Sequence, residues 1–173
     1  AAILRWAAVD DLVAAAALGG DVPFCVRGGR ARVEGIGERV TPLDYEPREF
    51  VLLVPPFGVD TGAAYARWDE LALGRADAGR PEAGASGPNA LTSAAIHVEP
   101  RLAAWRELLG ETTGRTPVLA GSGSTWFVEG SAKELGVTGQ SVLVLGREEG
   151  RLIPVRTVPA GWAGEGPGGA PGV

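Results

Sequence analysis

The sequence predicts an α+β fold in which helices lie on one face of a small, mainly antiparallel sheet. Three observations lead to this fold class. The apolar run at residues 50–54, stopped by two prolines, is typical of a buried strand. Apolar side chains recur at helical spacing in residues 63–73 and 101–109. Short apolar runs also flank the glycine turn at residues 121–123, as they do in a β-hairpin.

Composition limits the class of protein. The chain of 173 residues is 45% hydrophobic and 21% charged, which suits one globular domain, or one domain plus part of another. No apolar run approaches the roughly 20 residues of a membrane-spanning helix. The net charge of −5 disfavours a nucleic-acid partner. With Cys25 as its one cysteine and His97 as its one histidine, the sequence offers no disulfide framework and no zinc ligand set. We therefore expect a cytoplasmic protein with no metal-ligating residues and no nucleic-acid or membrane partner.

Two short helices are expected at the N-terminus. Residues 3–8 and 12–17 place apolar side chains at helical spacing. Asp10 or Asp11 is suited to cap the second helix, and the glycines at residues 19–20 to end it.

A turn that contains Asp21 follows these helices. Because Pro23 disfavours the helical conformation in the residue before it, we expect Val22 to be extended and to fix the direction of the Asp21 carboxylate. Residues 24–27 and 30–34 are then predicted to pair as a hairpin, since the two glycines between them supply the positive φ angles of a tight turn.

The other elements follow a change in composition near residues 45–49. Helices are expected at residues 63–73, 89–98, 101–109 and 131–135, and strands at residues 50–54, 117–120, 125–129 and 141–145. Four tryptophans are expected in the core: Trp6, Trp68, Trp105 and Trp126. The pattern divides the chain into residues 1–44, residues 45–158 and a disordered Gly/Pro-rich tail at residues 159–173.

Four motifs at compatible spacing resemble one family. They are Leu-Gly-Gly-Asp-Val-Pro-Phe at residues 18–24, Glu-Gly-Ile-Gly-Glu at residues 34–38, Val-Asp-Thr at residues 59–61 with Tyr65 four residues on, and Gly-Ser-Gly-Ser-Thr-Trp-Phe at residues 121–127. The set is similar to that of the 4-diphosphocytidyl-2-C-methyl-D-erythritol kinases, which belong to the GHMP kinase superfamily. The resemblance extends from the start of the chain to about residue 130.

The resemblance implies a fold and an activity. Residues 1–44 would be the C-terminal part of the GHMP kinase N-terminal domain, and residues 45–158 its C-terminal domain, a ferredoxin-like α/β sandwich. The activity would be transfer of the γ-phosphoryl group of ATP, with Mg²⁺, to the 2-hydroxyl of 4-diphosphocytidyl-2-C-methyl-D-erythritol in the non-mevalonate isoprenoid pathway. The partners would be ATP and this small molecule.

The resemblance also implies roles for seven residues. Asp21 would be the catalytic residue, Ile36, Thr61 and Tyr65 would bind substrate, and Gly121, Ser122 and Gly123 would support the phosphate-binding loop. From the residues alone, ordinary structural roles remain open: Asp21 in turn chemistry, the glycine loop as a hairpin turn, Thr61 as an N-cap, Tyr65 in the core and Ile36 in simple packing. The residue types suit the chemistry, because a carboxylate accepts a hydroxyl proton and the N–H groups of a glycine turn attract anions.

Three features of the family are missing from these 173 residues: a glycine-rich loop around the ATP phosphates, a short motif before it, and a lysine upstream of the catalytic aspartate. No stretch upstream of Asp21 has the repeated glycines that cradle ATP phosphates, and the one lysine, Lys133, lies far downstream. We therefore expect the sequence to begin just past the nucleotide loop, and the isolated polypeptide to show no kinase turnover. The alternatives are another GHMP kinase, acting on mevalonate or homoserine, and a noncatalytic interaction module.

Overall fold

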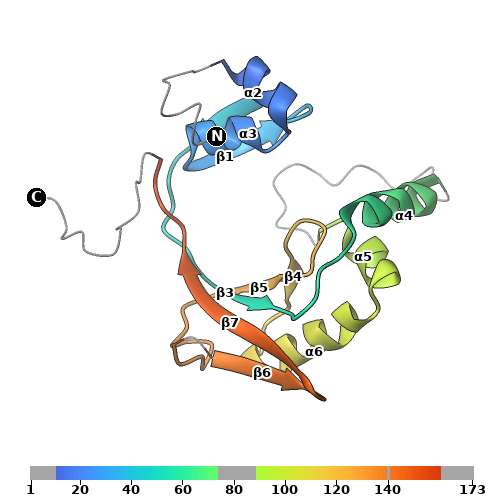
Figure 1. Ribbon diagram of the computed structural model, residues 1–173. Coiled ribbons are helices and arrows are strands. Elements are labelled where there is room, and N and C mark those ends of the chain that lie inside the picture. The colour runs from blue at the N-terminus through green and yellow to red at the C-terminus, as the bar shows by residue number, and fades with distance from the viewer. Residues whose placement is uncertain (1–10, 74–88, 140, 161–173) are drawn as a thin grey trace, which may run out of the picture. The chain divides into compact units, whose positions relative to one another are not determined.

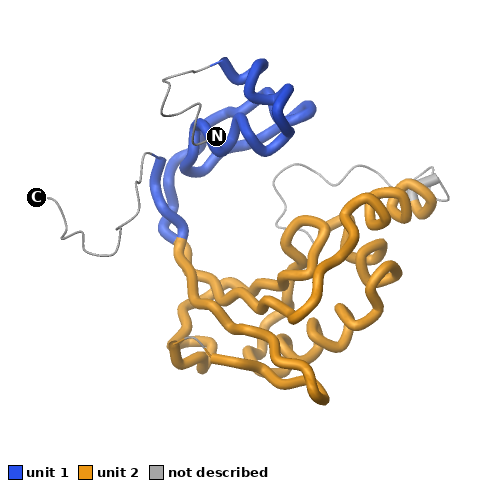
Figure 2. Tube along the Cα trace, in the orientation of Figure 1, with its two compact units in different colours: residues 1–47, 157–173 blue, residues 48–156 orange. Residues whose placement is uncertain are grey.

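The structure of the protein is a computed structural model that describes residues 11–73, 89–139 and 141–160 (Figure 1). The chain forms two compact units (Figure 2): unit 1 is residues 1–47 with 157–173, and unit 2 is residues 48–156. Among the described residues, no helix is both long and apolar enough to cross a membrane. The assignment of residues 1–44 and 45–158 to the two domains of a GHMP kinase stays a prediction.

Several predictions concern residues outside the described part of the chain. These are the helix expected at residues 3–8, the loop at residues 74–88, Trp6, and all but the first two residues of the tail expected at residues 159–173.

Unit 1 contains two helices and a hairpin. Helix α2 (Leu12–Leu18) and helix α3 (Val22–Arg27) precede strands β1 (Arg30–Glu34) and β2 (Arg39–Leu43), which pair antiparallel. Helices α2 and α3 contact each other.

The predicted limits of α2 are confirmed. The Asp11 carboxylate accepts the main-chain N–H groups of Val13 and Ala14, each at 3.0 Å, which satisfies two of the free donors at the helix start. The helix ends at Gly19, whose N–H donates to the carbonyl of Ala16.

The hairpin predicted for residues 24–27 and 30–34 is wrong in its first strand. Val22–Arg27 is helix α3, and β1 pairs with β2 instead. Pro23 lies in the first helical turn, where its missing N–H has no helical partner to lose and its fixed φ suits the helix. Val22 is therefore helical rather than extended. The turn of the real hairpin uses Gly35 and Gly37, with φ of +71° and +109°.

Unit 2 is an α+β sandwich. Its helices are α4 (Thr61–Leu73), α5 (Thr92–Val98) and α6 (Arg101–Thr113), and its strands are β3 (Glu49–Val54), β4 (Val118–Leu119), β5 (Trp126–Glu129), β6 (Ser141–Leu145) and β7 (Glu148–Arg156). The strands form one sheet in the order β4-β5-β3-β7-β6, in which every neighbouring pair is antiparallel (Figure 1).

The core of unit 2 lies between one face of this sheet and the helices α5 and α6. Val51 and Leu53 alternate along β3 with half-buried residues, and both are fully buried. They pack in one cluster with Trp105 of α6 and Trp126 of β5, which are also fully buried. The predictions that these two tryptophans belong to the core are confirmed.

Three expectations for unit 2 differ from the structure. Residues 131–135 form turns instead of a helix, because the segment lies between two positive-φ glycines and is too short to propagate one. Strand β7 was not predicted, since Gly150 and Pro154 interrupt its pattern. Trp68 of α4 is 39% exposed and lies outside the core.

Gly150 allows β7 to lie against the core, and its replacement by alanine is expected to destabilise unit 2. A Cβ atom there would lie 2.6 Å from Cζ3 of Trp105 and 3.0 Å from Cδ1 of Leu53, both fully buried. We expect Gly150→Ala to lower the free energy of unfolding by about 1–3 kcal/mol in urea titrations. Gly58→Ala is the control, because a Cβ atom at Gly58 meets no described atom within 4 Å. Equal unfolding midpoints for the two variants would contradict this packing.

Candidate functional site

Asp21 occupies the N-cap position of α3 without acting as a cap. Its backbone is helical (φ −85°, ψ −13°), and its carboxylate makes no capping hydrogen bond to the helix. The residue is exposed. Asp11, by comparison, uses its carboxylate to cap α2. Because the Asp21 carboxylate does not cap α3, it is available to a ligand.

The turn that carries Asp21 packs against the turn of the β1–β2 hairpin. A Cβ atom on Gly37 would lie 1.9 Å from the carbonyl oxygen of Gly20, and one on Gly20 would lie 2.8 Å from the carbonyl oxygen of Ile36. Because real Cβ atoms do not approach this closely, glycine is required for the two main chains to touch. The motifs at residues 18–24 and 34–38 thus meet in space within unit 1.

Glu38 holds the shape of the hairpin turn. Its carboxylate accepts the main-chain N–H of Ile36 at 2.8 Å. The pKa of Glu38 is lowered below its usual value, first by its own main-chain N–H and then by that of Ile36, so the carboxylate stays charged at neutral pH. Ile36 is 76% exposed. Packing among the described residues therefore does not explain why a large apolar side chain stands at position 36.

Thr61 and Ser122 meet in unit 2, although 61 positions separate them in the sequence. Thr61 is the first residue of α4, and its Oγ1 lies 2.8 Å from the Oγ of Ser122, with either hydroxyl able to donate. The capping role at the start of α4 belongs to Asp60, whose Oδ1 accepts the N–H of Ala63 at 2.8 Å. Tyr65, one turn along the helix, is 52% exposed and is not a core residue.

The loop between β4 and β5 turns through two glycines in left-handed conformation. Gly121 and Gly123 have φ of +58° and +99°, which only glycine adopts readily. The N–H of Gly123 donates to the carbonyl of Ala120 at 3.0 Å. Within the described residues, the main-chain N–H groups of Gly121 and Ser122 donate no hydrogen bond. Free N–H groups in a left-handed turn form a concavity that suits anions.

Asn89 is a residue of this site that sequence reasoning missed. Its Nδ2 donates to the carbonyl oxygens of Leu119 and Gly121 at 3.0 and 2.5 Å, and its Oδ1 accepts the N–H of Leu91 at 2.9 Å. The sequence signal was an asparagine just before an apolar helix, which indicates a helix start. That signal could not reveal a contact with a loop some 30 residues away.

A second anchor joins the loop to the segment between β3 and α4. The buried hydroxyl of Ser124 donates to the carbonyl of Phe57. The guanidinium of Arg101 lies over the Phe57 ring at 4.0 Å and pairs with Glu99 and Glu148, each at 2.8 Å. Arg101 therefore contacts the ring of Phe57 while Ser124 binds its main-chain carbonyl. These two contacts fix Phe57, and Phe57 in turn fixes the position of Ser124.

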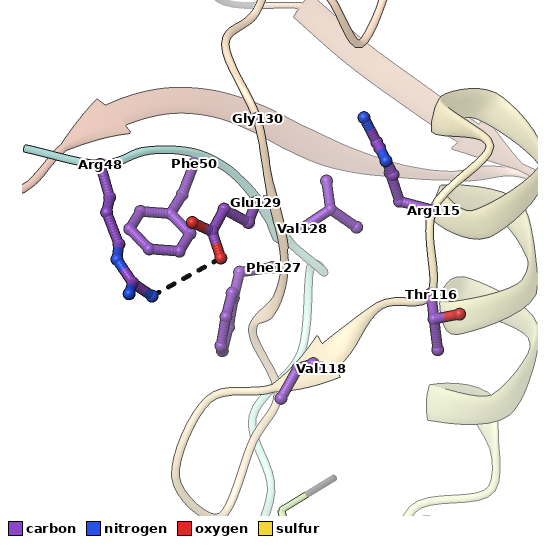
Figure 3. Close-up of a pocket in the computed structure, with 9 residues that line it drawn as sticks. All are labelled: Arg48, Phe50, Arg115, Thr116, Val118, Phe127, Val128, Glu129 and Gly130. Atoms are coloured by element: carbon purple, nitrogen blue, oxygen red, sulfur yellow. Dashed lines mark ion pairs between the residues drawn. The ribbon is translucent and has the colours of Figure 1, made fainter. Parts of the chain in front are cut away.

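A hollow of about 760 Å³ opens elsewhere in unit 2, beside the edge of β5 (Figure 3). Phe50 and Phe127, two of its lining residues, meet edge to face with 5.7 Å between ring centroids. Arg48 pairs with Glu129 at 3.7 Å, on the side of the lining away from Arg115 and Thr116. None of the seven predicted site residues lines this hollow. In the described part of the chain, no three His, Cys, Asp or Glu side chains gather as they would around a metal ion.

Comparison with solved structures identifies the class of protein. The chain matches a crystal structure of 4-(cytidine 5'-diphospho)-2C-methyl-D-erythritol kinase with a TM-score of 0.50 and 26% identity. The match covers 82% of this chain and 56% of that one. The predicted fold class, an α+β GHMP kinase fold, is confirmed. No family model matches the sequence.

Curated relatives narrow the likeness to a particular enzyme. The chain is 30% identical over 127 residues to the 4-diphosphocytidyl-2-C-methyl-D-erythritol kinase of Nitrosomonas eutropha, covering 73% of this chain and 46% of the relative. It is 49% identical over 53 residues to the Clostridium beijerinckii kinase of that name, 30% of this chain and 19% of the relative. The Symbiobacterium thermophilum kinase is 51% identical over 70 residues, 39% of this chain and 23% of the relative.

The chain is therefore a homologue of the 4-diphosphocytidyl-2-C-methyl-D-erythritol kinases, as its motifs predict. These matches span less than half the length of the curated relatives.

Proposed function

We propose that the chain belongs to an ATP-dependent kinase that phosphorylates the 2-hydroxyl of 4-diphosphocytidyl-2-C-methyl-D-erythritol in the non-mevalonate isoprenoid pathway. One observation carries the proposal beyond homology. The motif with Thr61 and the glycine loop with Ser122, far apart in the sequence, meet through their hydroxyl groups at 2.8 Å. A hydrogen bond thus joins two of the motifs that carry the kinase resemblance within unit 2.

Asp21 would accept the proton of the attacking hydroxyl. Phosphoryl transfer passes through a loose transition state, so the protein contributes mainly positioning, charge stabilisation and a place for this proton. The exposed carboxylate of Asp21, which makes no capping hydrogen bond to α3, supports this role. The contact between Gly20 and Gly37 would hold the carboxylate in one position.

The glycine loop would support the phosphate-binding loop, and its own N–H groups would face a phosphate of ATP. The N–H groups of Gly121 and Ser122 have no partner within the described residues, and their left-handed turn suits an anion, so this part of the chain fits a phosphate group. Mg²⁺ would add charge neutralisation when bound with ATP.

Substrate contacts are proposed for Ile36, Thr61 and Tyr65. The half-exposed ring of Tyr65 offers a flat face on which a cytosine base could stack. The Thr61 hydroxyl, one turn earlier on α4, lies on the same side of the helix. The exposed Ile36 side chain offers apolar contact in unit 1. Gly123 would support the loop through its positive φ.

The organisation and location of the protein complete the proposal. Residues 1–44 would be the end of a GHMP kinase N-terminal domain, and residues 45–158 its C-terminal domain. The cytoplasm is the compartment we propose, because the phosphoryl donor is ATP. The partners would be ATP and the small-molecule acceptor.

A panel of acceptors tests this function. The complete gene product is incubated with ATP, Mg²⁺ and one of three acceptors: 4-diphosphocytidyl-2-C-methyl-D-erythritol, mevalonate or homoserine. We expect ADP release only with the first. A preference for mevalonate or homoserine would assign another GHMP activity, and no transfer to any acceptor would favour a noncatalytic module.

A further inference from the structure

We propose that Asn89 is a positioning residue that orients the main chain of the loop at residues 121–123 for phosphate contact. The inference rests on the proposed function and extends it to a residue outside the four motifs. Asn89 lies just before α5 and is partly buried. All of its side-chain hydrogen-bonding groups face main-chain partners: two carbonyl oxygens accept from Nδ2, and one N–H donates to Oδ1.

The geometry of the peptide unit explains how Asn89 acts on the loop. In a trans peptide the C=O and the following N–H point in opposite directions. Asn89 binds the carbonyl of Gly121, so the N–H of Ser122 in the same peptide unit points away from Asn89. That N–H donates to no group within the described residues. One side-chain bond thereby fixes the direction of a free donor.

The carbonyl of Leu119 gives the loop a fixed base. Asn89 donates to this carbonyl at 3.0 Å. The N–H of the same peptide unit, which belongs to Ala120, donates to the main-chain carbonyl of Thr125 at 2.9 Å. The Thr61 hydroxyl holds the Ser122 side chain at 2.8 Å. Because the base and the side chain have other partners, the peptide between Gly121 and Ser122 is the part whose direction depends on Asn89.

Two substitutions separate the contacts of Asn89 with the loop from its contact with the N–H of Leu91. Asn89→Asp keeps an oxygen that accepts the N–H of Leu91, but places the second carboxylate oxygen against the carbonyls of Leu119 and Gly121, where it repels both. Asn89→Ala removes both functions. Ser93→Asp is the matched control, since it adds the same charge four residues on, in the first turn of α5, at an exposed residue.

Kinetics of the complete gene product form the first test. We expect Asn89→Asp to lower kcat at least about tenfold, because removing one donor to a developing oxyanion costs on the order of 10²–10³-fold in other enzymes. KM for the acceptor should stay within about threefold, and the melting temperature within a few degrees of wild type. Ser93→Asp should retain wild-type kcat. A kcat within twofold of wild type for Asn89→Asp would overturn the inference.

Amide NMR of the 173-residue chain keeps this test separate from the proposed function. We expect the Ser122 N–H resonance to move in Asn89→Asp and to stay in place in Ser93→Asp. Inorganic pyrophosphate should shift Ser122 in the wild type and less in Asn89→Asp. If these changes occur while the gene product transfers no phosphoryl group, the proposed kinase function fails and the orienting role stands. An unmoved Ser122 resonance in Asn89→Asp would overturn the orienting role whatever the activity.

Discussion

Replacing Asp21 with asparagine in the complete gene product is expected to lower kcat by about 10²–10⁴-fold, the range over which a positioned general base contributes. KM for 4-diphosphocytidyl-2-C-methyl-D-erythritol should stay within a few-fold, because the carboxylate acts mainly in the transition state. Asparagine has the same shape, and the Asp21 carboxylate caps no helix, so the melting temperature should stay near that of wild type. Steady-state ADP release and thermal unfolding provide the measurements.

The same substitution at Asp11 is the control for Asp21. Asp11 caps α2 through its carboxylate, and an asparagine oxygen can accept the same hydrogen bonds. Asp11→Asn should therefore leave both kcat and the melting temperature unchanged. If Asp21→Asn kept kcat within twofold of wild type, or lost stability instead of turnover, Asp21 would be a turn residue with no part in the chemistry.

Replacing Gly37 with alanine is expected to separate the hairpin turn from the turn that carries Asp21. The new Cβ atom would lie 1.9 Å from the carbonyl oxygen of Gly20, and the φ of +109° is itself unfavourable for alanine. Strain and overpacking each cost about 1–3 kcal/mol. Hydrogen exchange should accelerate at the N–H of Val22, which donates to Gly19 in the same turn. Turnover should fall with it, because Asp21 loses its support.

Gly136→Ala distinguishes the clash at Gly37 from backbone strain alone. Gly136 also has a positive φ, +69°, but a Cβ atom there meets no described atom within 4 Å. It should lower the melting temperature modestly and leave exchange at Val22 unchanged. Equal effects of the two substitutions would mean that the contact between Gly20 and Gly37 does not support the turn.

Local signals predicted most elements of unit 2 and α2. A continuous apolar run stopped by prolines indicated β3, and an aspartate followed by apolar periodicity and two glycines set the limits of α2. These signals succeed because each depends on residues close in the sequence. Burial at alternate positions of β3 then follows from the pleat of the strand.

The local rules failed where one residue suits two structures. Pro23 disfavours a helix before it, but it also favours the first turn of a helix, and the second effect prevailed in α3. Pro154 disfavours a strand, yet β7 includes it opposite Val51 of β3, beyond the stretch that pairs with β6. Which effect prevails depends on tertiary neighbours that the local pattern does not contain.

The site was only partly visible in the sequence. The motifs identified Thr61 and Ser122, but not that their hydroxyl groups meet at 2.8 Å. Glycines in two motifs suggested turns, whereas the close approach of Gly20 and Gly37 depends on the packing of α3 beside the hairpin. Asn89 was missed because its partners lie in a loop some 30 residues away.

Phosphorus-31 NMR of the product tests the proposed activity most directly. The C2 atom of the acceptor carries a hydroxyl and a methyl group but no hydrogen. A phosphate ester at C2 therefore gives a resonance without the three-bond proton coupling that esters at the primary or secondary hydroxyls show. We expect the complete gene product to convert ATP and 4-diphosphocytidyl-2-C-methyl-D-erythritol into ADP and a product with one unsplit phosphomonoester resonance. A proton-split ester resonance, or no ester at all, would contradict transfer to the 2-hydroxyl.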